Sequence, residues 1–304
     1  MINLTILGCH SATPRVNAFP TSQYLEINNN HFLIDCGEGT QRQMRKYKVG
    51  FSKINHIFIS HLHGDHFYGL VGLLSTYGIL NREKEMHIFG PKGIKAATLQ
   101  MLKISESHAK FSMIFHELSS KKSELIYEDK KVTVHTIPLT HRVYTNGYLF
   151  KEKEKPRKLN MLNINGYPEI DKADYLNIKA GRDVQLASGE VISNSSITIA
   201  PSKSLSFAFC SDTSYKPDIV PIIKNVDLLY HEATFLADRQ ELAKKTKHST
   251  SVEAAQIAKE ANVGQLVIGH YSGRYPDTSL FQKEAESVFK NVSLARPGVI
   301  FTIN

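Results

Sequence analysis

The sequence lacks any apolar run long enough to cross a membrane, and it contains few cysteines. A membrane-spanning helix needs about 18 or more consecutive apolar residues, and no such stretch occurs. The chain opens directly on the strand-like run Ile2 to Leu7, without a basic region or a cleavage site. The cysteines Cys9, Cys36 and Cys210 are too few and too scattered for a disulfide framework or a thiolate metal cluster. We therefore expect a cytoplasmic protein with reduced, buried thiols and no membrane partner.

Internal repeats and low-complexity segments are also absent. With 304 residues, 41% hydrophobic and 22% charged, the chain has the composition of a globular protein that buries a core. Lys and Arg (37) exceed Asp and Glu (29) by 8, which gives a pI near 9.2. This excess favours polyanionic partners through long-range attraction, although a solvated surface with spare lysines accounts for it equally well.

Short β-rich runs and helical segments alternate along most of the chain, which predicts an α/β fold. The predicted strands are Leu4–Leu7, Tyr24–Ile27, Phe32–Asp35, Ile54–Ser60, Met86–Phe89, Glu124–Tyr127, Val132–Pro138, Ser206–Cys210, Leu228–Tyr230 and Leu266–Gly269. The predicted helices are Gly39–Lys46, Gly69–Tyr77, Lys92–Ser105, Asp218–Asn225, Ser251–Ala261 and Asp277–Phe289. Ser249 or Thr250 is the expected N-cap of the helix that carries Glu253.

The apolar periodicity disappears between Lys151 and Asp183. Five of the eight residues from Lys151 to Lys158 are basic, and a stretch rich in Gly, Pro and Asp follows. This composition indicates an insertion.

Four potential metal donors follow an apolar run within six residues, in the pattern H-x-H-x-D-H: His61, His63, Asp65 and His66. The spacing places imidazoles and a carboxylate on one turn, where they converge on one point. Zinc binds such donors at about 2.0–2.2 Å. The alternative is a histidine-rich surface loop, which explains neither the preceding strand nor Gly64 between the donors.

Three further donors follow later strand-like runs. His141 comes after the run that ends near Ile137, Asp212 after Cys210, and His270 after Gly269. Taken singly, a histidine or aspartate at a strand end is more often a structural hydrogen-bonding residue. Together with the first cluster, however, these donors are enough for two metal ions about 3.5–4 Å apart.

The order of these seven donors resembles the ligand set of metallo-β-lactamase-fold dinuclear zinc enzymes. Other segments resemble the motifs of ribonuclease Z in order and spacing: Asp35–Thr40, Gly39–Arg42, His231–Phe235, His248–Thr250 and His270–Tyr275. The resemblance covers essentially the whole chain. It implies a zinc-dependent endoribonuclease that removes the 3′ trailer from precursor tRNA and leaves a 3′-hydroxyl.

The resemblance also implies an architecture. It predicts one domain over residues 1–304, an αβ/βα sandwich of two sheets flanked by helices, with a protruding tRNA-binding arm inserted at residues 151–183 and assembly as a homodimer. Each subunit would hold two zinc ions, the first bound by His61, His63 and His141, the second by Asp65, His66 and His270, with Asp212 as the bridge.

Further residues have expected roles in catalysis or substrate binding. Asp65 is the natural base or orienting carboxylate for the attacking water, and His248 is available as a proton donor that Glu232 orients. Arg274 can pair with a phosphate, although a structural ion pair is an equal alternative. In the insertion, the expected phosphate contacts are Lys155, Arg157 and Lys158.

Two rival functions use the same sequence features. A zinc phosphodiesterase or lactonase acting on small molecules needs the metal donors but gains nothing from a basic arm. A metal-free RNA-binding protein needs the arm but not the complete donor set. The loop Thr13–Asn17 departs from the Pro-x-Lys-x-Arg-Asn pattern of many ribonuclease Z members, which leaves treatment of the 3′ CCA end open. The insertion lacks their Gly-Pro motif, which leaves the construction of the arm open.

Overall fold

The computed structural model describes residues 1–107 and 109–304, which divide into two compact units. The larger unit comprises Met1–Lys151 and Leu205–Asn304, and the smaller comprises Glu152–Ser204. All three cysteines are buried and unpaired, as expected. Every helix in the described residues is too short or too polar to span a bilayer.

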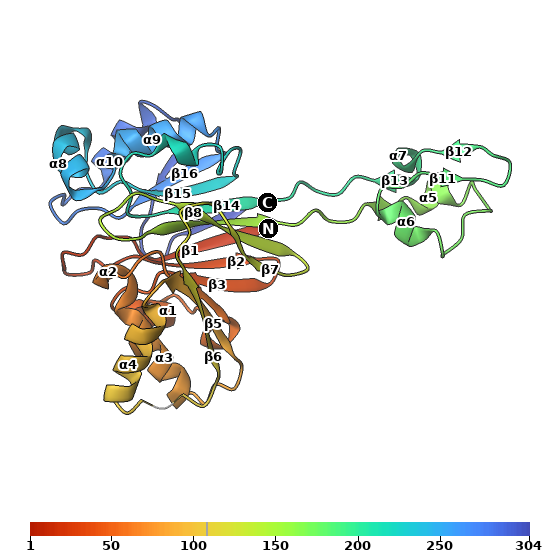
Figure 1. The fold of residues 1–304 in the computed structure, drawn as a ribbon. Coiled ribbons are helices and arrows are strands. Elements are labelled where there is room, and N and C mark those ends of the chain that lie inside the picture. The colour runs from red at the N-terminus through yellow and green to blue at the C-terminus, as the bar shows by residue number, and fades with distance from the viewer. Residues whose placement is uncertain (108) are drawn as a thin grey trace. The chain divides into compact units, whose positions relative to one another are not determined.

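Two seven-stranded sheets built from described residues form the larger unit (Figure 1). The first has the order β18 (Ile300–Ile303), β1 (Ile2–Gly8), β2 (Ser22–Ile27), β3 (Asn30–Ile34), β4 (His56–Phe58), β5 (Met86–Pro91) and β6 (Met113–Leu118). The second has the order β17 (Val292–Leu294), β16 (Gln265–Gly269), β15 (Leu228–Glu232), β14 (Ser206–Cys210), β9 (Asn146–Glu152), β8 (Val132–Pro138) and β7 (Leu125–Glu128). The predicted α/β sandwich is therefore confirmed.

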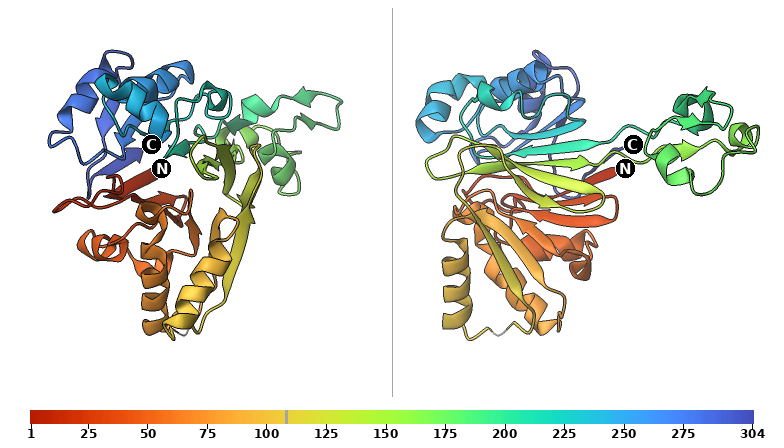
Figure 2. Two further views of the ribbon diagram at one scale, coloured as in Figure 1. Left: turned by 60° about the vertical axis from the view of Figure 1, so that its left-hand side comes forward. Right: turned by 45° about the vertical axis from the view of Figure 1, so that its right-hand side comes forward.

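Helices cover the outer face of each sheet (Figure 2). The first sheet carries α1 (Thr40–Lys46), α3 (Gly69–Ile79) and α4 (Ile94–Ile104), and the short α2 (Gly64–Phe67) precedes α3. The second sheet carries α9 (Ser251–Glu260) and α10 (Ser279–Glu286), with α8 (Gln240–Thr246) before them. Thr250 caps α9 in a reciprocal capping box with Glu253, which confirms one of the two expected caps.

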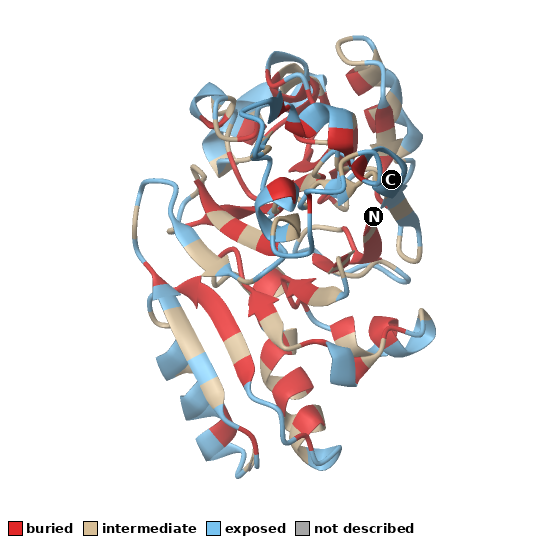
Figure 3. Cartoon of the chain, turned by 90° about the vertical axis from the view of Figure 1, so that its right-hand side faces the viewer, coloured by how far each residue is buried: buried red, intermediate tan, exposed pale blue. Residues whose placement is uncertain are grey.

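Aromatic side chains join the inner faces of the two sheets. The ring of Phe150 on β9 lies 5.2 Å from that of Phe32 on β3 and 5.3 Å from that of Phe58 on β4, measured between ring centroids. All three are fully buried, and buried residues concentrate along the strands (Figure 3). Phe32 and Phe58 belong to strands whose sequences are mostly apolar. Burial of these strands fixes how the two sheets face each other.

The smaller unit has its own regular structure and core. It contains the strand pairs β10 (Lys158–Leu159) with β13 (Thr198–Ile199) and β11 (Val184–Gln185) with β12 (Val191–Ile192), together with α5 (Met161–Ile164), α6 (Tyr175–Lys179) and α7 (Asn194–Ile197). Its core consists of Ile164, Ile170, Ile178, Ile192 and Ile197. The unit extends to Ser204, past residue 183 where the sequence analysis ended the insertion. The core of this unit is built from widely spaced single isoleucines, which produce no apolar periodicity in the sequence. The end of the insertion was therefore placed too early in the sequence analysis.

One predicted helix is wrong. Residues 218–225 form a short 3-10 turn, Pro217–Ile219, followed by further tight turns. The amide of Val220 donates to the carbonyl of Pro217 and that of Ile222 to the carbonyl of Ile219, so these hydrogen bonds span three residues. Only the bond from Ile223 to Ile219 spans four among the described residues of this segment, which is too little for a helix.

Candidate metal centre

The seven donors predicted from the sequence all lie at one edge of the sandwich. His61 follows β4, His63 directly precedes α2, and Asp65 and His66 lie within α2. The other donors follow strands of the second sheet: His141 follows β8, Asp212 follows β14 and His270 follows β16. Strand ends from both sheets therefore supply the site.

Three residues at these strand ends adopt a left-handed backbone conformation. The φ angles are 56° at Asp35, 59° at Asp212 and 63° at His270. This conformation is uncommon for residues other than glycine and costs on the order of 1 kcal/mol or more at each position. The surrounding structure therefore holds the chain in sharp turns at these positions, and the turns direct the side chains towards the site.

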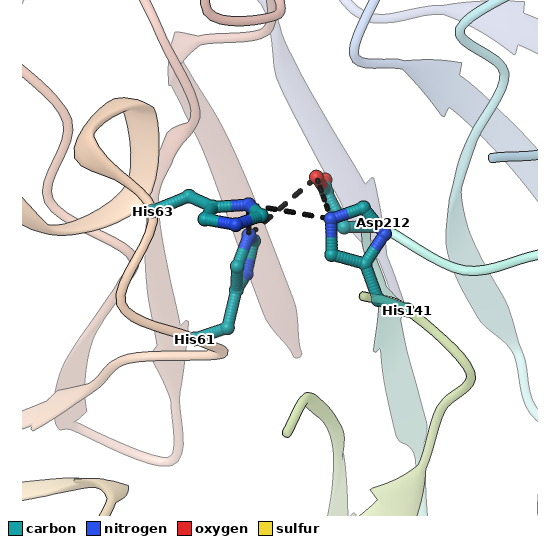
Figure 4. Close-up of side chains that lie close together, drawn as sticks. All are labelled: His61, His63, His141 and Asp212. Atoms are coloured by element: carbon teal, nitrogen blue, oxygen red, sulfur yellow. Dashed lines mark hydrogen bonds and ion pairs between the residues drawn. The ribbon is translucent and has the colours of Figure 1, made fainter. Parts of the chain in front are cut away.

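The first group of donors consists of His61, His63, His141 and Asp212 (Figure 4). Nδ1 of His63 lies 3.0 Å from Nε2 of His61 and 3.3 Å from Nε2 of His141. Oδ2 of Asp212 lies 3.5 Å from Nε2 of His61 and 3.7 Å from Nε2 of His141.

The second group consists of Asp65, His66 and His270. Nε2 of His270 lies 3.3 Å from Nε2 of His66 and 3.3 Å from Oδ2 of Asp65. The other carboxylate oxygen of Asp212, Oδ1, lies 3.1 Å from Nε2 of both histidines. Asp212 therefore faces one group with each of its oxygens.

These separations fit metal coordination. Donors about 2.1 Å from a tetrahedral metal ion stand roughly 3.4 Å from one another, and most of the distances above lie within a few tenths of an ångström of that value. Although burial opposes ionisation, His270, His66 and His61 hold the pKa of Asp212 well below its usual range, so it is a carboxylate. The donor set fits a metal centre.

Hydrogen bonds from neighbouring groups fix which ring nitrogen faces the centre. Nδ1 of His66 lies 2.6 Å from Oδ2 of Asp35, which also accepts a hydrogen bond from the hydroxyl of Ser60 (2.9 Å). Nδ1 of His270 lies 2.8 Å from the hydroxyl oxygen of Thr234, and Nδ1 of His141 lies 2.8 Å from the carbonyl of Lys247. In all three histidines Nε2 is left for a metal ion.

His248 and Glu232 form a pair at the edge of the centre. Nδ1 of His248 lies 2.8 Å from Oε1 of Glu232, which is fully buried. Glu232 also accepts hydrogen bonds from the backbone amides of Thr213 and Thr234, both 3.0 Å long. Burial opposes protonation of His248, but the charge and hydrogen bond of Glu232 outweigh it and raise the pKa of His248 to about 9.

Two adjoining cavities open on the centre, and His63, Asp65 and Arg142 line both. One cavity, of about 470 Å³, is lined by His248 and by the exposed Arg274. The other, of about 740 Å³, lies beside Asp65 and contains Tyr68.

The remaining predicted substrate contacts lie in the smaller unit. Nζ of Lys155 lies 3.5 Å from Oε2 of Glu152. Nε of Arg157 donates to the hydroxyl of Thr198 (2.6 Å), so this side chain also holds the unit together. Lys158 is exposed at the start of β10.

Sequence analysis missed several residues that the structure places at the site. Asp35 was noted only within a motif, although it follows an apolar run as the metal donors do. Thr234 and Ser60 carry no pattern of their own. Arg142, next to His141, lines both cavities, and no sequence feature pointed to Tyr68.

The sandwich and its donor set define a protein of the metallo-β-lactamase fold. The structure superimposes on the metallo-β-lactamase-fold protein YhfI of Bacillus subtilis with a TM-score of 0.70 at 20% identity, covering 99% of this chain and 100% of that one. It superimposes on the short form of human tRNase Z with a TM-score of 0.72 at 25% identity, covering 99% of each chain.

Sequence comparison narrows this class. The ribonuclease Z of Bacteroides thetaiotaomicron is 45% identical over 301 residues, 99% of this chain and 95% of that protein. The ribonuclease Z of Cytophaga hutchinsonii is 46% identical over 303 residues, 99% of this chain and 96% of that protein. A family model described as anti-Pycsar protein Apyc1 matches residues 2–155. The chain belongs to the ribonuclease Z family, and its residues 2–155 also belong to the family of that model.

Proposed function

We propose that this protein is a metal-dependent endoribonuclease that removes the 3′ trailer from precursor tRNA and leaves a 3′-hydroxyl on the tRNA. One observation carries the proposal: a chain 45% identical to a ribonuclease Z over 99% of its length has two donor groups joined by the carboxylate of Asp212. Paired metal sites of this kind suit in-line displacement at a phosphodiester.

We infer that the metal is zinc, with two ions in each subunit. One ion would be held by His61, His63 and His141. The other ion would be held by Asp65, His66 and His270, and Asp212 would bind both ions. Imidazole nitrogens and carboxylate oxygens are donors that zinc accepts. When bound, such ions supply a water of lowered pKa and positive charge that offsets the charge of the phosphate.

The side chains around the ions would orient the attacking water and supply a proton. Oδ2 of Asp65 faces His66 and His270, which supports a role for this carboxylate in orienting the attacking water. Glu232 holds Nδ1 of His248, so Nε2 is left to donate a proton to the departing 3′-oxygen. Arg274 lines the same cavity as His248 and would bind a neighbouring phosphate.

The chain would be one metallo-β-lactamase-fold domain whose insertion is a tRNA-binding arm. The basic segment from Lys151 to Lys158 and the net charge of +8 support binding of a polyanion. In the arm, Lys155, Arg157 and Lys158 would contact phosphates of the tRNA.

We further propose a homodimer in the cytoplasm. Exposed apolar side chains on the adjacent helices α3 and α4 support self-association, since Ile79 is 79% exposed and Ile104 73% exposed. Light scattering of the purified protein should give twice the mass of the 34.2 kDa chain.

Hydrolysis of small phosphodiesters or lactones is the alternative, because the same set of metal donors suits these substrates and needs no basic arm. One measurement tests the metal, and a second decides between the two kinds of substrate. Elemental analysis should give two zinc ions per chain. Incubation with one precursor tRNA that encodes CCA and one that lacks it, followed by mapping of the ends, should show cleavage at the 3′ side of the tRNA body. Absence of cleavage, with no competition by precursor tRNA in a small-diester assay, would favour the small-molecule enzyme.

A further inference from the structure

The cavity of about 740 Å³ beside Asp65 has no role in the chemistry proposed above. It opens onto the metal centre next to the cavity of His248, and His63, Asp65 and Arg142 line both. The two adjoining cavities offer space for the two groups of a diester whose phosphate sits at the centre. The volume is in the range of ligand-binding clefts.

Tyr68 forms a flat aromatic wall of this cavity. Its side chain is 69% exposed although it stands directly after the metal-binding helix α2. One side of the ring rests on the backbone at Gly64, because a Cβ atom there would lie only 2.4 Å from Cε2 of Tyr68. Glycine at position 64 thus leaves room for the ring, which packs against the backbone there and is otherwise largely exposed.

Two arginines also line the cavity. Arg42 on α1 and Arg142 after His141 are both exposed. Neither guanidinium has a hydrogen-bond or ion-pair partner among the described residues, so both are available to an anion. An aromatic surface flanked by free arginines matches a nucleotide, in which a base stacks and phosphates pair with guanidinium groups.

We propose that this cavity binds the first nucleoside of the trailer, with its base stacked on Tyr68. The assignment rests on the proposed function. Water attacks phosphorus, the bond from phosphorus to the 3′-oxygen breaks, and His248 protonates that oxygen, so the nucleoside that carries it occupies the His248 side. The nucleoside joined through its 5′-oxygen keeps the phosphate and enters the other cavity. Arg142 then contacts the scissile phosphate, and Arg42 contacts the next one.

The test compares precursor tRNAs that differ only at the first trailer nucleotide, which carries either a base or an abasic site. Wild-type enzyme should cleave the base-containing substrate with a kcat/KM about 5- to 150-fold higher, the range for one stacked base. Tyr68→Phe should keep this ratio because the ring remains, whereas Tyr68→Ala should bring it close to one. Tyr215→Ala, at an exposed tyrosine outside both cavities, is the matched control and should keep the ratio.

The outcomes separate this inference from the proposed function. If wild-type enzyme cleaves neither precursor, the proposed function fails and the inference fails with it. If it cleaves both equally, or if Tyr68→Ala keeps the full ratio, the nucleoside subsite is wrong while the endonuclease activity stands. Arg42→Gln should weaken cleavage of a three-nucleotide trailer but not of a one-nucleotide trailer without a 3′-phosphate, and equal effects on both would remove Arg42 from the subsite.

Discussion

Oδ2 of Asp35 lies 2.6 Å from Nδ1 of His66, and both side chains are fully buried. The two residues stand 31 positions apart in the chain. Asp35 directly follows β3, and His66 lies in α2, which comes after the neighbouring parallel strand β4. The contact fixes the ring of His66 so that Nε2 faces Asp212 and His270. Asp35 is thus part of the metal centre without facing it.

Replacement of Asp35 should therefore weaken metal binding. Asp35→Ala removes the acceptor that orients His66, and loss of such a partner lowers metal affinity about 10- to 100-fold. Competition with a zinc chelator measures the change. Asp35→Asn is the matched control, because its amide oxygen can still accept from His66 and the loss should be smaller. Wild-type affinity in Asp35→Ala would mean that other contacts position the ring.

Asp212→Ala should lose bound metal and activity together, since it removes an oxygen from both donor groups. Elemental analysis and a phosphodiesterase assay measure the two effects on the same sample. Asp218→Ala, at an exposed carboxylate in the following loop, should keep both. Two zinc ions and normal turnover in Asp212→Ala would contradict the paired centre.

His248→Ala should keep both metal ions yet slow cleavage of precursor tRNA by about 10²- to 10⁴-fold, the usual contribution of a general acid. Glu232→Gln keeps the shape of the pair but removes its charge, so an intermediate loss is expected. Because His248 also lies within reach of Asp212 and His270, metal analysis is essential here. Loss of an ion in His248→Ala would make His248 a ligand instead of an acid.

Replacement of Glu152–Ser204 by a short Gly/Ser linker should preserve hydrolysis of a small chromogenic diester, because all the metal donors lie in the other unit. Cleavage of precursor tRNA should fall through weaker apparent affinity, with a shallower salt dependence. Charge reversal of Lys155, Arg157 and Lys158 to Glu should give a milder defect.

The charge reversal at Arg157 also breaks its bond to Thr198, so Lys158→Glu, at an exposed side chain, is the cleaner single change. Unchanged affinity and salt slope in the linker variant, once it is shown to be folded, would make the segment a spacer.

The stability of the fold should depend on pH through His56. Burial, together with the neighbouring His87 and His116, lowers the pKa of His56 to about 4. The carboxylates of Asp129 and Glu85 raise this pKa, but by less than the other groups lower it. In the unfolded chain the imidazole of His56 binds a proton below about pH 6.5. In the folded chain it binds that proton only below about pH 4. Stability is therefore lost as the pH falls from 6.5 towards 4.

His56→Gln should lose less stability than wild type between pH 6.5 and 5, by at most about 2 kcal/mol. Urea unfolding of both proteins at the two pH values gives the difference. Identical losses would show that His56 titrates normally in the folded protein.

The sequence by itself determined the α/β class and singled out the seven donors, while the sandwich was implied by the resemblance to a known family. The alternation of strands and helices is a local property that the backbone expresses directly, and the donors come after apolar runs. The N-cap of α9 was narrowed to Ser249 or Thr250 for the same reason. The predicted helix at Asp218–Asn225 failed because its apolar residues support tight turns as well as a helix.

Only the tertiary structure decided which atoms meet. His66 and His270 are 204 positions apart, yet their Nε2 atoms lie 3.3 Å from each other because the two sheets pack face to face. The same packing directs each oxygen of Asp212 to a different donor group, turns Asp35 towards a histidine, and leaves Tyr68 on the wall of a cavity. Such contacts depend on long-range sheet packing and on strained turns at strand ends, and the local sequence encodes neither.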